Sequence, residues 1–315
     1  MSHKLIVSSS PHLHKKESVS KIMWTVAACL IPAGAAGVFI FGLDALWVIL
    51  LCIGSAVATE GVLQFLTKRK ITVLDGSAFL TGLLLAYNLP PKVPFWLPVI
   101  GSCFAIAIGK QVFGGLGQNI FNPALVGRVF LMASWPSYMT SFTRPMQYDA
   151  ITSATPLMLL KEGKWAEQIS SFNLFLGNRG GCIGEVCIVA LLIGALYLLL
   201  KGYISWHIPL TYILTVGVFT YIFGPQGLFS GDWLFHILSG GLILGAFFMA
   251  TDYVTSPLTY KGQIIFALGC GLLTAVIRLW GGYPEGVSYA ILMMNAAVPI
   301  IDRYTKNRVY GTRCK

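Results

Sequence analysis

Ten apolar runs, separated by short polar segments, follow one another from residue 22 to residue 301. A helix needs about 20 mostly apolar residues to cross the hydrocarbon core of a bilayer. The pattern therefore predicts an all-α polytopic membrane protein with about ten transmembrane helices. An even number of crossings leaves both termini on one side of the membrane. The runs lie at 22–41, 45–66, 77–89, 95–109, 119–133, 183–200, 203–223, 233–250, 263–280 and 287–301.

The runs fall into two sets of five with shared features. The segment 76–90 is a short glycine-containing run that leads into prolines, and 239–257 repeats that order in the second set. A glycine pair precedes the last run of each set, at 114–115 and at 281–282. Five spans per repeat invert the second copy, which places binding sites between short or broken helices near the midplane. The alternative is that small residues recur because they let helices approach closely in any bundle.

This pattern predicts one membrane domain between two tails. Within the domain, a long connection separates the two repeats, and we expect it on the side away from the termini. The expected boundaries are a tail at 1–21, a membrane domain at 22–301 with repeats at 22–133 and 183–301 and an outer loop at 134–182, and a tail at 302–315.

The composition agrees with a membrane protein and excludes other classes. Of the residues, 56% are hydrophobic and 11% are charged, whereas soluble domains carry about 25% charged residues. The net charge of +10 does not indicate nucleic-acid binding, because the cations lie in short loops without interleaved aromatic side chains. Lys and Arg are in excess on the side of the termini, Lys110 being counted there, which predicts cytoplasmic termini.

The seven cysteines do not suggest a metal centre. No two of them have the two-residue spacing of zinc or iron–sulfur ligands. We expect them to be small apolar packing residues. Cys182 and Cys187 both fall near the outer edge of the membrane, where a disulfide between them is conceivable.

One segment of the outer loop carries candidate chemistry. Asp149 is followed by Thr152, Ser153 and Ala154, and then by Thr155 before a proline. On composition alone, this is a Ser/Thr turn or helix N-cap before the apolar pair 159–160.

The same segment resembles the flavinylation motif Asp-x-x-[Ser/Thr]-x-Ala-Thr of a family of membrane proteins. The family comprises the B subunit of the sodium-pumping NADH:quinone reductase and the D subunit of the Rnf complex. Further matches lie at 10–12, 114–124, 245–257 and 281–288, so the resemblance covers nearly the whole chain. The short amino-terminal tail is more similar to the Rnf protein than to its quinone-reductase relative.

The resemblance implies two flavins. In that family, the last Thr of the motif carries FMN through a phosphoester bond that a separate flavin transferase makes, and Thr155 is the matching position. Asp149 would help position the transferase or its metal. A site outside the membrane suits a bulky anionic cofactor, which is costly to place in lipid.

The family also binds riboflavin without a covalent link near the cytoplasmic end of its fifth span. By resemblance, Asn119 and Asn122 fall in that pocket. An Asn side chain offers a donor and an acceptor, and a spacing of three puts both amides on one helix face. The alternative is that the two Asn residues bind the unpaired amides at a helix start, with Pro123 at an early position.

Four ionisable residues lie within or at the ends of apolar runs: Glu60 and Arg278 deep in theirs, Arg128 and Glu185 at shallower positions. A charge at the bilayer centre costs at least about 2.5–3.5 kcal/mol, so each should face a partner, a cofactor or an aqueous path. Glu60 is the candidate for ion passage. The alternative is a paired group that fixes helix register, which we favour for Arg128 and Arg278.

The resemblance implies an electron-transfer subunit of an ion-translocating ferredoxin:NAD oxidoreductase in a prokaryotic inner membrane. Its partners would be the other Rnf subunits, a flavin transferase, lipid, and a sodium ion or proton. We do not expect it to bind NAD or ferredoxin itself, because the sequence has no Rossmann fingerprint and no cluster-ligand cysteine pattern. The alternatives are a component of a quinone reductase, a small-solute channel of the urea and ammonium type, whose architecture has similar inverted repeats, and a structural scaffold without flavin.

Overall fold

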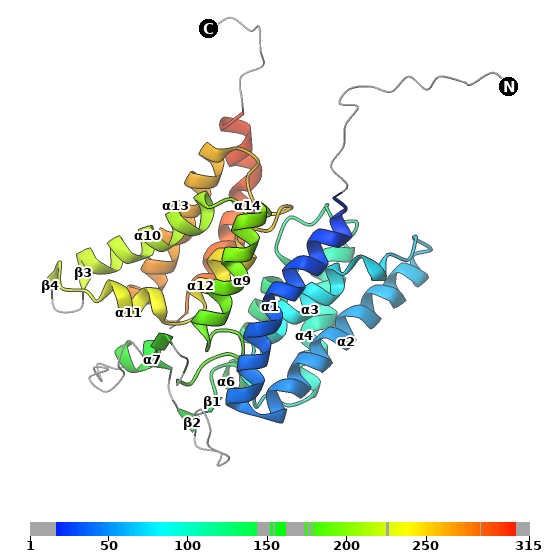
Figure 1. Cartoon of the computed structure of the whole chain (residues 1–315), viewed down its shortest axis with the longest axis horizontal. Helices are drawn as coiled ribbons and strands as arrows, with labels where there is room; N and C mark the ends of the chain where they lie inside the picture. Colours follow the sequence, from blue (N-terminus) through cyan, green and yellow to red (C-terminus); the bar gives the residue numbers. More distant parts are fainter. Residues whose placement is uncertain are drawn as a thin grey trace, which may run out of the picture.

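The computed structural model is mostly helical in the part of the chain that it describes (Figure 1). The short strands form two separate antiparallel hairpins, β1 with β2 and β3 with β4. The described residues are 17–143, 152–153, 155–161, 174–175, 177, 179–224, 227–283 and 285–306.

Three helices are each long and apolar enough to cross a membrane, namely α1 (Val19–Phe41), α2 (Leu43–Leu66) and α13 (Tyr260–Trp280). Shorter apolar helices accompany them, so the predicted polytopic helical class is confirmed. The number of ten crossings stays a prediction. The other elements of the first half are η1 (Val73–Asp75), α3 (Ser77–Tyr87), α4 (Trp96–Ile106), η2 (Ala107–Gln111), α5 (Pro123–Ser134), α6 (Pro136–Met139), β1 (Phe142–Thr143), β2 (Thr152–Ser153) and α7 (Pro156–Lys161). Those of the second half are α9 (Ile188–Lys201), α10 (His207–Ile222), β3 (Phe223–Gly224), β4 (Gly227–Leu228), α11 (Trp233–Leu238), α12 (Leu242–Leu244), η3 (Gly245–Met249) and α14 (Val287–Tyr304).

Local sequence sets the boundaries of the first helical hairpin. The Ser18 hydroxyl accepts a hydrogen bond from the Lys21 amide and caps α1 at 3.2 Å, which satisfies an unpaired N–H at the helix start. Gly42 is the single residue between α1 and α2, and its φ of +77° suits glycine because a Cβ strains that conformation. The chain therefore reverses direction within one residue.

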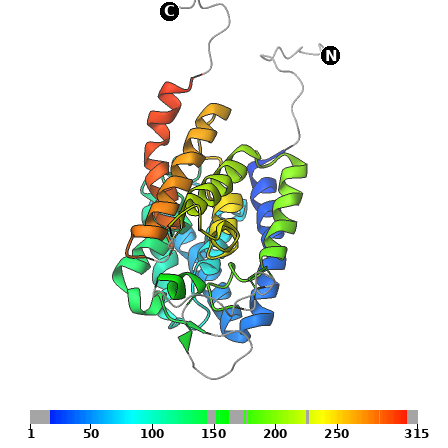
Figure 2. The same cartoon turned by 90° about the vertical axis from the view of Figure 1, so that its left-hand side faces the viewer.

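The two halves pack in the same order. In the first half, α2 contacts α3 and α4, and α4 contacts α5; in the second, α10 contacts α11 and α13, and α13 contacts α14. The halves meet where α1 packs on α9 and α5 on α14. Figures 1 and 2 both show α9 beside α1. Outward side chains such as Phe39 and Leu200 are each 79% exposed, which suits a surface that faces lipid.

The molecule has two distinct ends. α1 begins and α14 ends at one of them, which we call the termini side (Figure 1, top). α7 and the β1–β2 hairpin lie at the other end, which we call the opposite side.

One helix of the second half is interrupted. α11 ends at Leu238, and α12 begins only at Leu242, where it continues as the π-helical η3. The last carbonyls of a helix need partners when no water is near. The Arg278 guanidinium donates to the carbonyls of His236 and Ser239 at 2.5 and 3.0 Å, and Arg179 donates to that of Leu238 at 2.6 Å.

The first half has a matching short helix, α3, whose end also needs partners. The Tyr87 carbonyl accepts from the Gly184 amide at 3.0 Å, and the Leu89 carbonyl accepts from the Ile183 amide at 3.1 Å. The segment before α9 thus completes the end of α3. Cys182, in the same segment, and Cys187 are both unpaired, so the conceivable disulfide is absent from the structure.

Candidate functional site

The predicted site residues fall into two groups at opposite ends of the molecule. Asn119, Asn122 and Glu60 lie toward the termini side, near the start of α1 and the end of α2. Thr155 lies on the opposite side, directly before α7.

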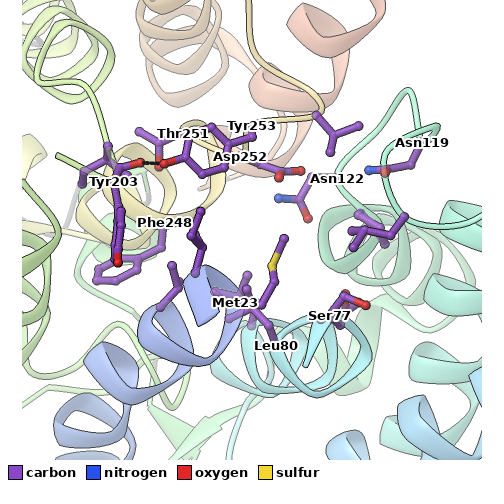
Figure 3. A pocket seen from close by; sticks show the side chains of 18 of the residues that line it. Met23, Ser77, Leu80, Asn119, Asn122, Tyr203, Phe248, Thr251, Asp252 and Tyr253 are labelled. Atoms are coloured by element: carbon purple, nitrogen blue, oxygen red, sulfur yellow. Dashed lines mark hydrogen bonds between the residues drawn. The ribbon is translucent and has the colours of Figure 1, made fainter. Parts of the chain in front are cut away.

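A cavity opens on the termini side between the two halves (Figure 3). It encloses about 770 Å³ of empty space, part of which is open to solvent. The starts of α1 and α3 and the residues before α5 line it from the first half. The turn between α9 and α10 and the end of η3 line it from the second half. Figure 3 shows Asn119 and Asn122 on one side and Tyr203 and Phe248 on the other.

Asn119 and Asn122 both line this cavity, so the structure brings the two predicted residues together. The Asn122 amide donates to the Met249 carbonyl at 3.3 Å, and its oxygen accepts from the Ala124 amide at 3.1 Å. Asn119 is 5% exposed and donates to the Phe121 carbonyl. Its side-chain oxygen is buried and has no hydrogen-bond partner among the described residues. An amide oxygen of this kind can accept a hydrogen bond from a donor that reaches it.

The prediction that both amides lie on one helix face is wrong. α5 begins at Pro123, so Asn119 and Asn122 precede the helix. The capping interpretation is confirmed for Asn122, which is the N-cap of α5 with Pro123 in its first turn. Asn119 is not a cap, and its side-chain oxygen has no hydrogen-bond partner among the described residues.

Glu60 is 1% exposed and sits in a buried polar cluster. The Lys110 ammonium lies 2.7 and 2.9 Å from its two carboxylate oxygens. The side-chain amides of Gln64 and Gln111 also donate to one of these oxygens, at 3.1 and 3.0 Å. The expectation that Glu60 faces a partner is therefore confirmed, and the partner is a cation.

Sequence reasoning missed the role of Lys110. The sequence places it in a loop on the termini side, but it lies in η2 and is 1% exposed. A π-helical turn continues α4 past the expected end at residue 109. The available signal was Glu60 itself, because a buried carboxylate needs a cation at the same depth, and Lys110 follows a neighbouring apolar run directly.

Thr155 is the N-cap residue of α7, as the composition predicts. Its hydroxyl accepts from the Met158 amide at 3.3 Å, and its carbonyl accepts from the Leu159 amide at 3.0 Å. The side chain is only 4% exposed. Of the other motif residues, Thr152 and Ser153 form β2, which pairs with β1. Asp149 and Ala154 lie outside the described residues.

Lys161, at the end of α7, ties this helix to the second half. Its ammonium donates to the Ile277 and Gly281 carbonyls at 3.4 and 2.5 Å, and also to the Tyr283 carbonyl. Burial against these groups lowers the pKa of Lys161 below its usual value. A small cavity beside Thr155 is lined by Arg179 and by two carboxylates.

Those carboxylates, Glu185 and Glu285, belong to a buried charge cluster on the opposite side. Arg128 donates to Glu285, lies 3.6 Å from Glu185 and donates to the Asn88 side-chain oxygen at 2.5 Å. Arg128 therefore joins α5 to the segments before α9 and α14. The interpretation of Arg128 as a paired group is confirmed, and so is that of Arg278, which binds the end of α11.

Cys182, Glu185 and Glu285 bring three potential metal-ligand atoms within 4.8 Å of one another. The same carboxylates face the Arg128 guanidinium, which also contacts the Cys182 sulfur at 3.8 Å. A fixed cation in this place disfavours a second one. The cluster is therefore an internal ion network in the described part of the chain.

Comparison with known proteins agrees with the sequence motifs. Residues 6–311 match the model of the NQR2, RnfD, RnfE family. The chain is 55% identical, over 98% of its length and 95% of the relative, to the D subunit of the Na⁺-translocating ferredoxin:NAD⁺ oxidoreductase complex of Acetobacterium woodii. It is 53% identical, over 98% and 96%, to the D subunit of the proton-translocating ferredoxin:NAD⁺ oxidoreductase complex of Clostridium ljungdahlii.

A more distant relative has the same extent. The D subunit of the ion-translocating oxidoreductase complex of Stutzerimonas stutzeri is 43% identical over 95% of this chain and 94% of its own. The match to the family model and the relatives spans both sets of apolar helices, the cavity and Thr155. The chain therefore belongs to the NQR2, RnfD, RnfE family.

Proposed function

We propose that this protein is the electron-transfer D subunit of an ion-translocating ferredoxin:NAD⁺ oxidoreductase complex. Relatives that are 55% and 53% identical over almost the full length have names that state this activity. The chain would act together with the other proteins of the complex, since it has neither a Rossmann fingerprint nor a cluster-ligand cysteine pattern.

The termini-side cavity is the proposed site of a non-covalent riboflavin. Bound flavins supply one-electron and two-electron redox chemistry. The observation that carries this proposal is that Asn119, a residue of the cavity wall, has a buried side-chain oxygen without a hydrogen-bond partner among the described residues. An isoalloxazine ring has an imide N–H between two carbonyls, and that donor suits a free amide oxygen. Apolar side chains such as Leu80 and Phe248 would contact the ring faces.

Thr155 is the proposed site of FMN, attached through a phosphoester bond by a flavin transferase. The hydroxyl is the group that a phosphoester requires, and Thr155 is the last residue of the segment that resembles the flavinylation motif. Because Thr155 is only 4% exposed, the transferase must act while 155–161 is not packed against the second half. The two flavins would then lie toward opposite ends of the molecule, and electrons would cross part of the membrane between them.

The two halves would be inverted repeats of five crossings each. Their equal packing order, from α1 to α5 and from α9 to α14, supports this arrangement. This arrangement would resemble the architecture of urea and ammonium channels. The excess of Lys and Arg on the termini side supports cytoplasmic termini in a prokaryotic inner membrane. Glu60 is the proposed stop on the ion route, and the ion is sodium or a proton, as the names of the two relatives illustrate.

The test is to purify the complex from cells that also express a flavin transferase. We expect a fluorescent band for this chain on a denaturing gel, and riboflavin released from the same sample by acid. Thr155→Val should lose the band and keep the riboflavin, whereas Asn119→Leu should lose the riboflavin and keep the band. Mass spectrometry of the intact chain should find one FMN phosphoryl adduct.

Matched controls separate these effects from misfolding. Thr140→Val changes another threonine on the same side of the molecule, and Gln118→Leu changes the exposed neighbour of Asn119. Both controls should keep both flavins. A colourless parent complex, or a band that survives in Thr155→Val, contradicts the proposal.

A further inference from the structure

Lys110 connects the proposed ion site with the proposed flavin site. Its side chain lines the termini-side cavity, and its ammonium binds both carboxylate oxygens of Glu60. The ammonium also donates to the Ser77 hydroxyl at 2.6 Å, and Ser77 lines the cavity as well. A charge in the cavity therefore acts on the same cation that neutralises Glu60.

Hydrogen bonds lead from this pair to the surface of the termini side. The Gln64 side chain donates to Glu60 and to the Thr72 hydroxyl, and its oxygen accepts from the Thr72 amide at 2.8 Å. Thr72 is exposed. On a second branch, the Ser77 hydroxyl donates to Asp75 at 2.5 Å, and Asp75 is half-buried. Glu60 thus lies a few polar groups from water, although it is itself buried.

The charges of the pair balance only while the cavity stays neutral. Lys110 and Glu60 together have no net charge, which is the condition for burying them. One extra electron in the cavity adds a negative charge in a region of low dielectric, where an opposite charge nearby is strongly favoured. The Lys110 side chain is long and has rotatable donors, so its ammonium has two competing acceptors, the carboxylate and the reduced cavity.

We propose that Lys110 and Glu60 form an exchangeable ion pair that couples electron arrival in the cavity to the uptake of a monovalent cation at Glu60. This proposal rests on the flavin of the proposed function. When one electron arrives from the preceding carrier of the complex, the Lys110 ammonium turns toward the cavity. Glu60 then binds one cation, H⁺ or Na⁺, which enters past Thr72 and Asp75.

The exchange conserves charge without breaking a covalent bond. One electron and one cation enter, so the cavity, Lys110, Glu60 and the cation again sum to zero. When the electron leaves for the next carrier, Lys110 returns to Glu60 and displaces the cation. A permanent structural ion pair predicts no such dependence of reduction on cation concentration.

The test is a redox titration of the non-covalent flavin in the purified complex, followed by its absorbance. In one arm the sodium concentration varies at constant pH, and in the other the pH varies at low sodium. The ratio of reduced to oxidised flavin is compared at constant applied potential. Each tenfold rise in the concentration of the coupled cation should multiply this ratio by up to about tenfold. A response to sodium identifies Na⁺, and a pH response larger in the parent than in Glu60→Gln identifies H⁺.

Two variants isolate Glu60 from other groups. The dependence of flavin reduction on cation concentration that is due to Glu60 should be lost in Glu60→Gln and in the double variant Lys110→Met/Glu60→Gln. The double variant leaves no unpaired buried charge and should therefore fold. Asp75 and Asp252, the acids next to Ser77 and along the cavity wall, remain in all variants. Asp44→Asn changes an exposed acid in the first turn of α2, the helix that carries Glu60, and should keep the full response.

The outcomes separate this proposal from the one on which it rests. A parent complex without non-covalent flavin overturns the proposed function and the exchange with it. Bound flavin whose reduction responds to neither cation overturns the exchange alone. So does a response of equal size in the parent and in Glu60→Gln.

Discussion

Arg128 offers the sharpest test of how the two halves are joined. Its guanidinium binds Glu285 and the Asn88 side chain and lies 3.6 Å from Glu185. Arg128→Met removes the cation and leaves two buried carboxylates without their nearest compensating charge. We expect the free energy of unfolding to fall by about 3–5 kcal/mol, the usual effect of removing one partner of a buried ion pair.

The loss of stability in Arg128→Met is limited because the two carboxylates can become protonated. A buried carboxylate that loses its cation takes up a proton instead of paying the full cost of an isolated charge. Arg128→Met/Glu285→Gln removes one of the two charges together with the cation. The double variant should therefore be more stable than the single variant, and the two substitutions should not be additive.

The assay uses cysteines that are buried and unpaired. Cys52 and Cys270 are fully buried, so a thiol-reactive dye in detergent labels them only as the protein unfolds on heating. Arg303→Met, which removes an exposed arginine, should shift the transition little, by about 0.5 kcal/mol or less. If Arg128→Met is as stable as Arg303→Met, or the double variant is less stable than the single one, Arg128 does not join the halves as argued.

Three further substitutions test separate parts of the fold and of the outer site. Gly184→Ala places a Cβ 2.3 Å from the Tyr87 Cβ, so we expect a loss of about 1–3 kcal/mol in the same melting assay, and an unchanged transition contradicts the packing. Thr155→Ser should keep both the cap and the gel fluorescence, whereas Thr155→Val should lose the fluorescence and about 1 kcal/mol of stability; a non-fluorescent Ser variant contradicts attachment through the hydroxyl. Lys161→Met removes the contacts with the Ile277 and Gly281 carbonyls, so purified unmodified chain should be flavinylated faster by added transferase; a time course equal to that of the parent shows that burial of Thr155 does not limit the reaction.

The helices were predictable because their signal is local. Long apolar runs gave α1 and α2 within a few residues, and the short run before Pro90 gave α3. It was also predictable that Arg128 and Arg278 would each have a polar partner, because an unpaired charge in lipid is costly whatever the partner is. The identity of the partners was not, since Glu285 and the carbonyls at the end of α11 are distant in sequence.

The details of the cavity depended on geometry that the sequence does not encode locally. A spacing of three suggested that Asn119 and Asn122 share a helix face, but Pro123 begins the helix and Asn122 caps it. The sequence suggests that Lys110 is a loop residue, because its neighbours are glycine and glutamine. The π-helical turn instead places its side chain beside Glu60. The burial of Thr155 follows from contacts of α7 with the second half, which no local pattern indicates.

The positions of both candidate sites follow from where helices stop inside the bundle. A continuous helix satisfies its own backbone groups, whereas a helix that ends among other helices leaves carbonyls and amides that need polar partners. Arg278 and Arg179 donate hydrogen bonds to the carbonyls at the end of α11, close to the charge cluster beside Thr155. Asn122 donates to the Met249 carbonyl, on the wall of the cavity. Polar side chains are therefore concentrated at these breaks for structural reasons, and the same breaks provide the room and the hydrogen-bonding groups that a bound cofactor needs.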